Sequence, residues 1–179
     1  VIVNYPAGSA LTVTNPYAAC GKVNLKDAIT NLDTSGNTTY TFFNTDGVTT
    51  MTEQAAANVM VNGTYFIQAQ TIGSACPSVK LPVAVTVNPL PTLTGVTNSI
   101  AVIKGAPVTL TASSNGTVTW YDQQGNAVSP NLGTLNTVGI YNYTVIATLG
   151  TCTASQTVTI SVIDPADCDS LLERVYANS

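Results

Sequence analysis

The sequence predicts an all-β protein made of two tandem β-sandwiches with a short C-terminal helical tail. Three observations support this prediction: an internal repeat, short strand patterns at regular spacing, and a polar composition rich in Thr and Asn. In the repeat, residues 39–47 (TYTFFNTDG) return as residues 117–125 (TVTWYDQQG), 78 positions later. One small β-sandwich has about that length, so the chain contains the same unit twice.

A second matched block supports the duplication. Gly63 precedes Cys76 by 13 residues, and Gly139 precedes Cys152 by the same number. Because this block follows the first block in the same order in both copies, a chance match is a poor explanation.

A third block locates an insertion. Residues 23–25 match residues 108–110 with an offset of 85 rather than 78. The first copy therefore carries about seven extra residues between its second and third strands. We place them within residues 26–37, where loop-forming residues are frequent.

Strand patterns follow one another at short intervals, as in a β-sandwich. The clearest pattern is residues 157–162, where apolar and hydroxyl side chains alternate as they do in a strand with one buried face. Residues 54–60 are Ala-rich and are interpreted as a loop or short strand, with a brief helical turn as the alternative. The strands expected in the first copy are 10–14, 22–25, 38–43, 48–52, 63–72 and 79–87.

Two prolines, Pro89 and Pro91, mark the boundary between the copies. Proline lacks a backbone donor and favours an extended path, so the sheet cannot continue through this segment. The expected organisation is a sandwich in residues 1–88, a Pro-rich linker in 89–91, a second sandwich in 92–163 and an acidic tail in 164–179.

The acidic tail contains a helix-start pattern. Ser170 stands three residues before Glu173, which is the spacing of a capping box. We expect one or two helical turns to about Ala177, with Leu172, Val175 and Tyr176 on one side. The alternative is a frayed tail, because so short a helix is marginal in water.

The composition excludes several functions. Charged residues make up 8% of the chain, the net charge is −4, and the five cations are scattered, so nucleic acid is not an expected partner. No apolar run is long enough for a membrane span. Val1 is not an initiator methionine, and we interpret the sequence as a piece of a longer protein.

The sequence lacks the common catalytic and metal-binding patterns. Histidine is absent, which removes Ser-His-Asp and Cys-His catalysis and the commonest zinc ligand. Asp164, Asp167 and Asp169 lie close together, but they lack the spacing of a calcium loop and are interpreted as a solvated, helix-capping stretch. We therefore expect no enzyme activity, no cofactor and no metal.

The aromatic residues of the repeat divide between core and surface. Phe42 and Trp120 are expected in the two cores, where such sandwiches bury an aromatic ring. Four others are expected on the opposite face, either in ordinary packing or as an exposed stripe that stacks on sugars. They are Tyr40, Phe43, Tyr121 and Tyr143.

The repeat resembles the immunoglobulin-like repeats of large secreted adhesins and gliding-motility-associated surface proteins of Bacteroidota. This resemblance implies two immunoglobulin-like sandwiches, export to the cell surface by the type IX route, and a role as adhesin or spacer. It also implies neighbouring immunoglobulin-like domains or copies of the chain as partners. The residues that carry it are 19–25, 63–67, 75–76 and 83–91 in the first copy, and 105–110, 119–121, 139–141 and 152–155 in the second.

Four cysteines in an all-β chain of low charge indicate disulfides and an oxidising, extracellular setting. The local pairing joins Cys20 to Cys76 and Cys152 to Cys168. In an immunoglobulin-like sandwich, however, Cys20 and Cys76 belong at opposite ends, about 17 to 20 Å apart, and a disulfide needs α-carbons within about 7 Å. The alternative joins Cys20 to Cys152 and leaves Cys168 for a neighbouring chain.

One modification site is also suggested. Residues 169–171 (DSL) resemble the short O-glycosylation motif of Bacteroidota, with Ser170 as the modified residue. Modification there would compete with the capping role of the same side chain.

These observations favour a structural and adhesive segment of an exported cell-surface protein, acting as a stalk or a filament-forming repeat. Two alternatives stay open. One is a carbohydrate-binding accessory pair of a secreted enzyme, with surface glycans as partners. The other is a subunit of a head-to-tail extracellular polymer.

Overall fold

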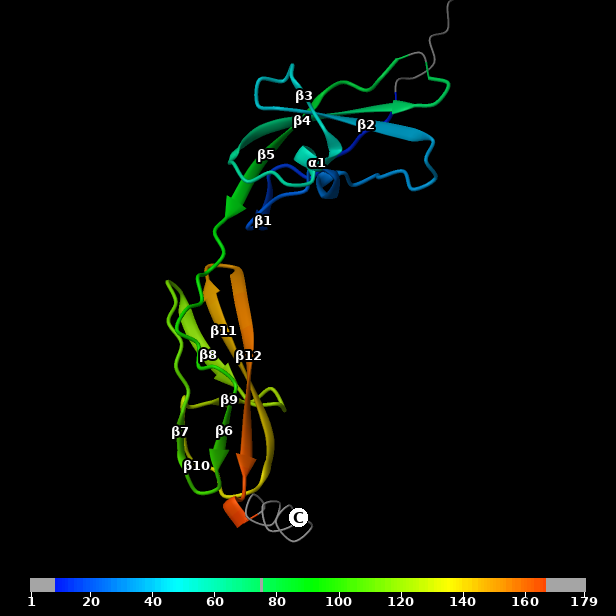
Figure 1. Ribbon diagram of the computed structural model, residues 1–179. Coiled ribbons are helices and arrows are strands. Elements are labelled where there is room, and N and C mark those ends of the chain that lie inside the picture. Colours follow the sequence, from blue (N-terminus) through cyan, green and yellow to red (C-terminus); the bar gives the residue numbers. More distant parts are fainter. Residues whose placement is uncertain (1–8, 75, 167–179) are drawn as a thin grey trace, which may run out of the picture. The chain divides into compact units, whose positions relative to one another are not determined.

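The computed structural model describes residues 9–74 and 76–166. The chain divides into two compact units between Pro89 and Leu90, and each unit is built almost entirely of strands (Figure 1). The predicted all-β fold is therefore confirmed. Each unit has its own hydrophobic core, so each is described by itself.

Unit 1 is organised around a five-stranded sheet in the order β1-β5-β4-β2-β3. Strand β1 runs parallel to β5, whereas the other neighbouring strands are antiparallel. The strands are β1 (Tyr17–Cys20), β2 (Thr38–Phe43), β3 (Thr50–Met51), β4 (Gly63–Thr71) and β5 (Leu81–Asn88).

A second, narrower layer closes the core of unit 1. It is held by two isolated antiparallel bridges, Val13 to Ile29 and Val23 to Val59. The core lies between the layers, because alternate residues of the sheet point inward. Its members include Leu25, Ile67 and Val83, all fully buried.

Two short helices lie between the strands of unit 1 where the sequence predicted strand or loop. The expected strand 22–25 is cut short by the 3₁₀ helix η1 (Leu25–Ala28), since the Asn24 side chain accepts a hydrogen bond from the Lys26 amide. For residues 54–60 the alternative of a brief helical turn is the correct one: helix α1 (Glu53–Ala56) begins there, with Thr52 as its N-cap. Side-chain caps of this kind satisfy amides at a helix start.

Unit 2 repeats the same architecture. A five-stranded sheet has the order β6-β12-β11-β8-β9, and β7 pairs with β10 in the second layer. The alternation predicted at residues 157–162 is confirmed, because Val158, Ile160 and Val162 are buried. The strands are β6 (Ile100–Ile103), β7 (Pro107–Thr109), β8 (Thr117–Tyr121), β9 (Ala127–Val128), β10 (Asn131–Thr134), β11 (Gly139–Leu149) and β12 (Cys152–Ile163).

Comparison of the units places the insertion where the sequence predicted it. In unit 1, residues 30–37 separate the bridge at Ile29 from the start of β2. In unit 2, only residues 114–116 separate the equivalent bridge, Thr94 to Ser113, from β8. Unit 1 thus has a longer loop at the side of its sandwich.

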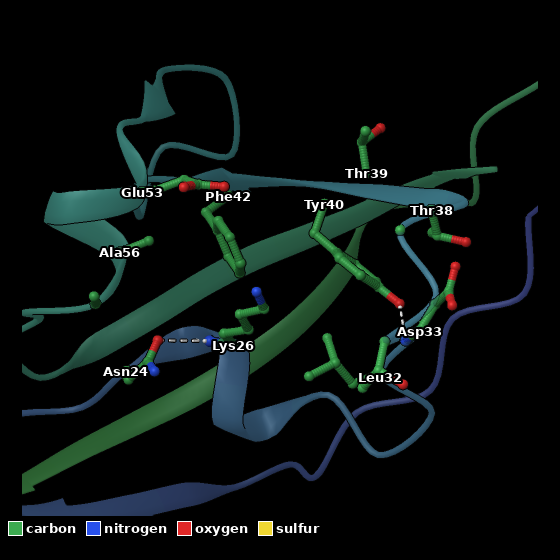
Figure 2. Close-up of a pocket in the computed structure, with 13 residues that line it drawn as sticks. Asn24, Lys26, Leu32, Asp33, Thr38, Thr39, Tyr40, Phe42, Glu53 and Ala56 are labelled. Atoms are coloured by element: carbon green, nitrogen blue, oxygen red, sulfur yellow. Dashed lines mark hydrogen bonds between the residues drawn. The ribbon is translucent and has the colours of Figure 1, made fainter. Parts of the chain in front are cut away.

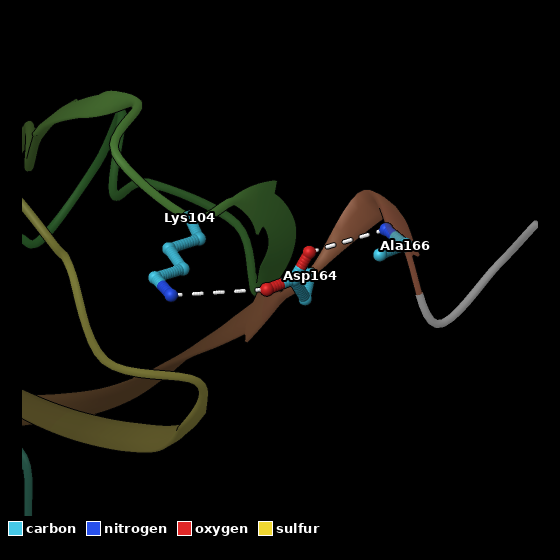
Figure 3. Close-up of polar contacts among 3 residues, drawn as sticks. All are labelled: Lys104, Asp164 and Ala166. Carbon is cyan, nitrogen blue, oxygen red and sulfur yellow. Dashed lines mark hydrogen bonds and ion pairs between the residues drawn. The ribbon is translucent and has the colours of Figure 1, made fainter.

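The end of unit 2 carries an exposed ion pair. Lys104 Nζ lies 3.7 Å from Asp164 Oδ2, and the other oxygen of Asp164 accepts a hydrogen bond from the Ala166 amide (Figure 3). An exposed pair of this kind stabilises a fold by about 1 kcal/mol at most. The helix predicted from Ser170, and Ser170 itself, lie outside the described residues.

In each unit, a sheet with one parallel edge strand faces a narrower antiparallel layer across a single core. This arrangement is that of an immunoglobulin-like β-sandwich, present here in tandem.

Candidate functional site

Across residues 9–74 and 76–166, no three His, Cys, Asp or Glu side chains come together as metal ligands. In the same part of the chain, no helix is long and apolar enough to cross a membrane.

Tyr40, Phe43, Tyr121 and Tyr143 do not form an exposed aromatic stripe, so of the two alternatives left open by the sequence the stripe is contradicted. Tyr143 is only 7% exposed, because it lies on the same core-facing side of β11 as Val145. Burial raises the pKa of its hydroxyl. Phe43 does lie on the opposite face, but it is 6% exposed and is covered by Lys80, whose Nζ lies 3.7 Å from the ring centroid. Tyr121 is half-buried.

Unit 1 has a hollow of about 640 Å³ at the side of its sandwich (Figure 2). Its walls come from four parts of the chain that are far apart in sequence: η1, the inserted residues 32–36, the first half of β2, and α1. The floor is apolar and includes Phe42 and Leu32, which belong to or pack against the core.

Two opposite charges line this hollow and have no partner among the described residues. Within the described residues, neither the Lys26 ammonium nor the Glu53 carboxylate forms an ion pair or a side-chain hydrogen bond. In Figure 2 the Lys26 side chain extends from η1 in the direction of β2. Both groups are therefore available to a bound molecule.

The third charged residue of the hollow, Asp33, is satisfied within its own loop. Its Oδ1 accepts hydrogen bonds from the Ser35 hydroxyl and the Ser35 amide. These bonds favour the carboxylate form and hold the pKa of Asp33 below its usual value. Asp33 therefore shapes the loop rather than offering a free charge.

Tyr40 connects the loop to the sheet. Its hydroxyl oxygen accepts a hydrogen bond from the Asp33 amide at 2.8 Å. A phenol that accepts one bond can still donate its own proton, so Tyr40 can offer a donor at the edge of the hollow.

Unit 2 has an equivalent but simpler hollow of about 460 Å³. Trp120 and Val118 stand at the places of Phe42 and Tyr40, because the repeat aligns β8 with β2. No charged residue lines it. The hollow of unit 1 therefore differs from that of unit 2 by the residues of the longer loop and by the charged side chains of Lys26, Asp33 and Glu53.

The cysteine geometry contradicts one predicted disulfide. Cys20 pairs in register with Asn88, at the end of β5, whereas Cys76 lies in the connection before β5 begins at Leu81. The two positions are separated by the length of β5, about 23 Å, which is too far for a disulfide. Cys76 is exposed and has a free thiol. The local pairing of Cys20 with Cys76 is therefore wrong.

The remaining described cysteines are both oxidised. Cys20 and Cys152 are each disulfide-bonded, and Cys152 is 1% exposed. Cys168 lies outside the described residues.

The charged hollow was not predicted from the sequence. The available signal was the insertion, since a loop present in only one of two copies is a common place for function. Lys26 lies within the range assigned to the insertion, but Glu53 is 27 positions further on. Only the fold shows that these two residues share a hollow.

No protein-family model and no curated protein matches the chain. Among solved structures, it is similar to the titin domains z1z2 in complex with telethonin, at 13% identity over 89% of this chain and 99% of that chain, with a TM-score of 0.35. It is also similar to extracellular domains 3–5 of Drosophila OTK, at 16% identity over 89% and 67% of the two chains, with a TM-score of 0.36. For the tandem Ig repeats of Dlar, the identity is 11% over 71% and 83%, and the TM-score is 0.37.

Proposed function

We propose that the chain is a non-catalytic, structural and adhesive segment of an exported cell-surface protein, and that it serves as a repeat unit of a stalk or filament. The observation that carries this proposal is the duplication of one β-sandwich, each copy with its own core and its own disulfide-bonded cysteine. Such repeats are suited to extending a chain rather than to enclosing a reaction.

The disulfide is proposed to join Cys20 to Cys152. The local partner of Cys20 is excluded, because Cys76 has a free thiol. The local pairing of Cys152 with Cys168 is disfavoured by the length of the strand that follows Cys152. Strand β12 runs for 12 residues, about 36 Å, from Cys152 to Ile163. Five residues of extended chain reach at most about 18 Å, which is about half the length of β12, so chain length argues against a local pairing of Cys152 with Cys168.

An oxidised pair supports an extracellular location, since cytosolic thiols are kept reduced. Export by the type IX route and a role in gliding motility are proposed on the resemblance of the repeat alone. Secretion can be tested by expressing the parent protein in a Bacteroidota host. The amount of the protein on the cell surface is then compared between the wild-type strain and a type IX secretion mutant.

A peptide map without reduction tests the disulfide. Free thiols are first blocked with iodoacetamide, the chain is digested, and linked peptides are identified by mass spectrometry. We expect a Cys20–Cys152 peptide that disappears after reduction, and an alkylated Cys76. A Cys20–Cys76 peptide would overturn the proposed joining of the units and would leave two independent domains.

A head-to-tail polymer is the second candidate, favoured by the exposed thiol of Cys76. In this arrangement the Cys76 thiol and the Cys168 thiol of another copy form one disulfide, losing two protons and two electrons to an oxidant such as glutathione disulfide. Non-reducing electrophoresis with glutathione disulfide tests it: a ladder is expected for the wild type and no ladder for Cys76→Ser. A wild type that stays monomeric would contradict the polymer.

The carbohydrate-binding alternative receives less support. Sugar stacking needs an exposed ring, and Phe43 and Tyr143 are covered.

A further inference from the structure

We propose that the hollow of unit 1 binds an extended peptide segment of another protein, which adds a strand to β2 and places an acidic side chain on Lys26 and a basic side chain on Glu53. The inference rests on the adhesive part of the proposed function and names its partner. Four features of unit 1 carry it: an open sheet edge, a hollow beside that edge, two free charges, and the lack of an exposed ring.

The open edge is the first half of β2. On the side away from β4, strand β3 pairs only with Phe42 and Phe43. The chain then leaves the sheet after Met51 and forms α1. Within the described residues, Thr38 to Thr41 therefore have no strand on that side.

The backbone of Tyr40 faces this open side. Its register partner on β4 is Ala69. The Ala69 amide donates to the Ser78 hydroxyl, and the Ala69 carbonyl accepts from the Ser78 amide, so neither group is directed at Tyr40. Because antiparallel pairs alternate between bonded and non-bonded, the amide and carbonyl of Tyr40 point away from β4. They are the groups that an added strand would use.

The hollow lies directly beside this edge. Thr38, Thr39 and Tyr40 line it on one side, and α1 lines it on another (Figure 2). Four residues of strand extend for about 13 Å, so the open edge can pair with a segment of about four residues. An added strand at this place would lie over the apolar floor.

The charges define the side chains of the segment. The chain has only 14 charged residues in 179, yet Lys26 and Glu53 both line this hollow and neither has an ionic partner in the described part of the chain. Side chains two positions apart point to the same face of a strand. The fitting peptide therefore carries one acidic and one basic residue at that spacing.

A peptide fits these features better than a sugar does. A sugar site would use an exposed aromatic face, and among the described residues of unit 1 no ring is exposed. Phe42, Phe43 and Tyr65 are buried, and Tyr17, Tyr40 and Phe66 are half-buried. A sugar also has no amides and carbonyls in register to pair with a strand edge. Glycan binding at this hollow is accordingly an outcome that would count against the proposal.

The experiment is a selection with a displayed library of random dodecapeptides, performed on the full chain and on the double variant Lys26→Ala/Glu53→Ala. We expect the full chain to enrich sequences with an acidic and a basic residue two positions apart. The double variant should bind the enriched peptides at least about tenfold more weakly, the loss expected when charged hydrogen bonds are removed. The control is Lys104→Ala/Asp164→Ala, which removes the same two charge types from unit 2 and should bind normally.

Strand addition has its own readout. An enriched peptide with N-methyl groups on alternate residues should lose binding when the methylated amides face β2, and should keep it when the other set is methylated. Hydrogen exchange at the Tyr40 amide should slow in the bound state. Both double variants are compared with the wild type by circular dichroism, so that a folding defect is not mistaken for lost binding.

Three results would overturn the inference. These are equal enrichment on the wild type and the Lys26→Ala/Glu53→Ala variant, equal effects of the two methylation sets, or binding of a glycan panel at the hollow in place of peptides. None of these results affects the Cys20–Cys152 peptide map. The peptide site and the structural role can therefore fail separately.

Discussion

Phe42 and Trp120 occupy the same position in the two sandwiches. Phe42 lies between Ile67 of β4 and Met51 of β3, and Trp120 lies between Val145 and Val128 on the equivalent strands. Phe42 is 5% exposed and Trp120 is 4% exposed. The duplicated sequence thus gives each unit one large ring at the same place in its core, so the two cores can be perturbed separately.

Replacing Phe42 with alanine should destabilise unit 1 by about 3–5 kcal/mol, because a large buried ring is removed and a cavity remains. Trp120 is the only tryptophan of the chain and lies in unit 2, so its fluorescence reports the unfolding of unit 2. In urea, the circular dichroism of Phe42→Ala should show an early transition, while the fluorescence midpoint stays near that of the wild type. Equal shifts of both signals would show that the two cores unfold as one.

Gly116 should not tolerate alanine. A Cβ atom added there would lie 2.2 Å from the carbonyl oxygen of Thr148, which belongs to the backbone of β11 and cannot rotate away. We expect a loss of about 3 kcal/mol or more, at the upper end for overpacked sites because the contacted atoms are backbone. The loss is measured from the urea midpoint by Trp120 fluorescence. Gly150→Ala is the matched control in unit 2. It has open space but a φ of +61°, so it should cost only about 1–2 kcal/mol. If the two variants have the same midpoint, the close approach at Gly116 is not a constraint.

Much of the fold could be predicted because its signals are local or repeated. The alternation at residues 157–162 marks buried and exposed faces directly, and the repeat placed Phe42 and Trp120 in equivalent cores. The same alternation of faces predicts that Tyr143 is buried, since Tyr143 stands two residues before Val145 and therefore shares its face. In that case the signal was present and was misinterpreted.

Other features were not predictable because they depend on pairing across the chain. Strand β1 is short and gains its structure from β5, some 68 residues later. Likewise, the hollow of unit 1 forms only where η1, β2 and α1 lie close together, and no pattern in the sequence predicts that they do.

Acid should weaken both sandwiches partly through turn carboxylates. The carboxylate of Asp46 accepts hydrogen bonds from the Thr49 hydroxyl and from the Val48 and Thr49 amides, which lowers the pKa of Asp46 below its usual 3.8. In unit 2, the Asn126 amide and side chain, with the Gln124 amide, lower the pKa of Asp122 in the same way.

Because these pKa values are lower in the folded state than in the unfolded state, the carboxylates stabilise the fold above about pH 4, and this stabilisation is lost as the pH falls through the lowered values. Asp122→Asn should therefore lower the urea midpoint at pH 7, and the difference from wild type should shrink towards pH 3. Trp120 fluorescence measures it, and Asp164→Asn is the control, because the Asp164 carboxylate accepts one amide hydrogen bond, from Ala166, where the Asp122 carboxylate accepts three hydrogen bonds. A difference that stays constant with pH would contradict the role of the charge.

The ammonium of Lys80 should stabilise the outer face of unit 1. It lies 3.7 Å from the centroid of the Phe43 ring and donates a hydrogen bond to the Gly47 carbonyl at 2.8 Å. Lys80→Met keeps an apolar chain of similar length over the ring but removes both interactions, so we expect a loss of about 1–2 kcal/mol. Lys80→Arg keeps a cation over the ring and should lose less. The urea midpoint of the unit 1 transition, followed by circular dichroism, gives the comparison. If Met is as stable as Lys at this position, the ring is covered by the aliphatic stem alone.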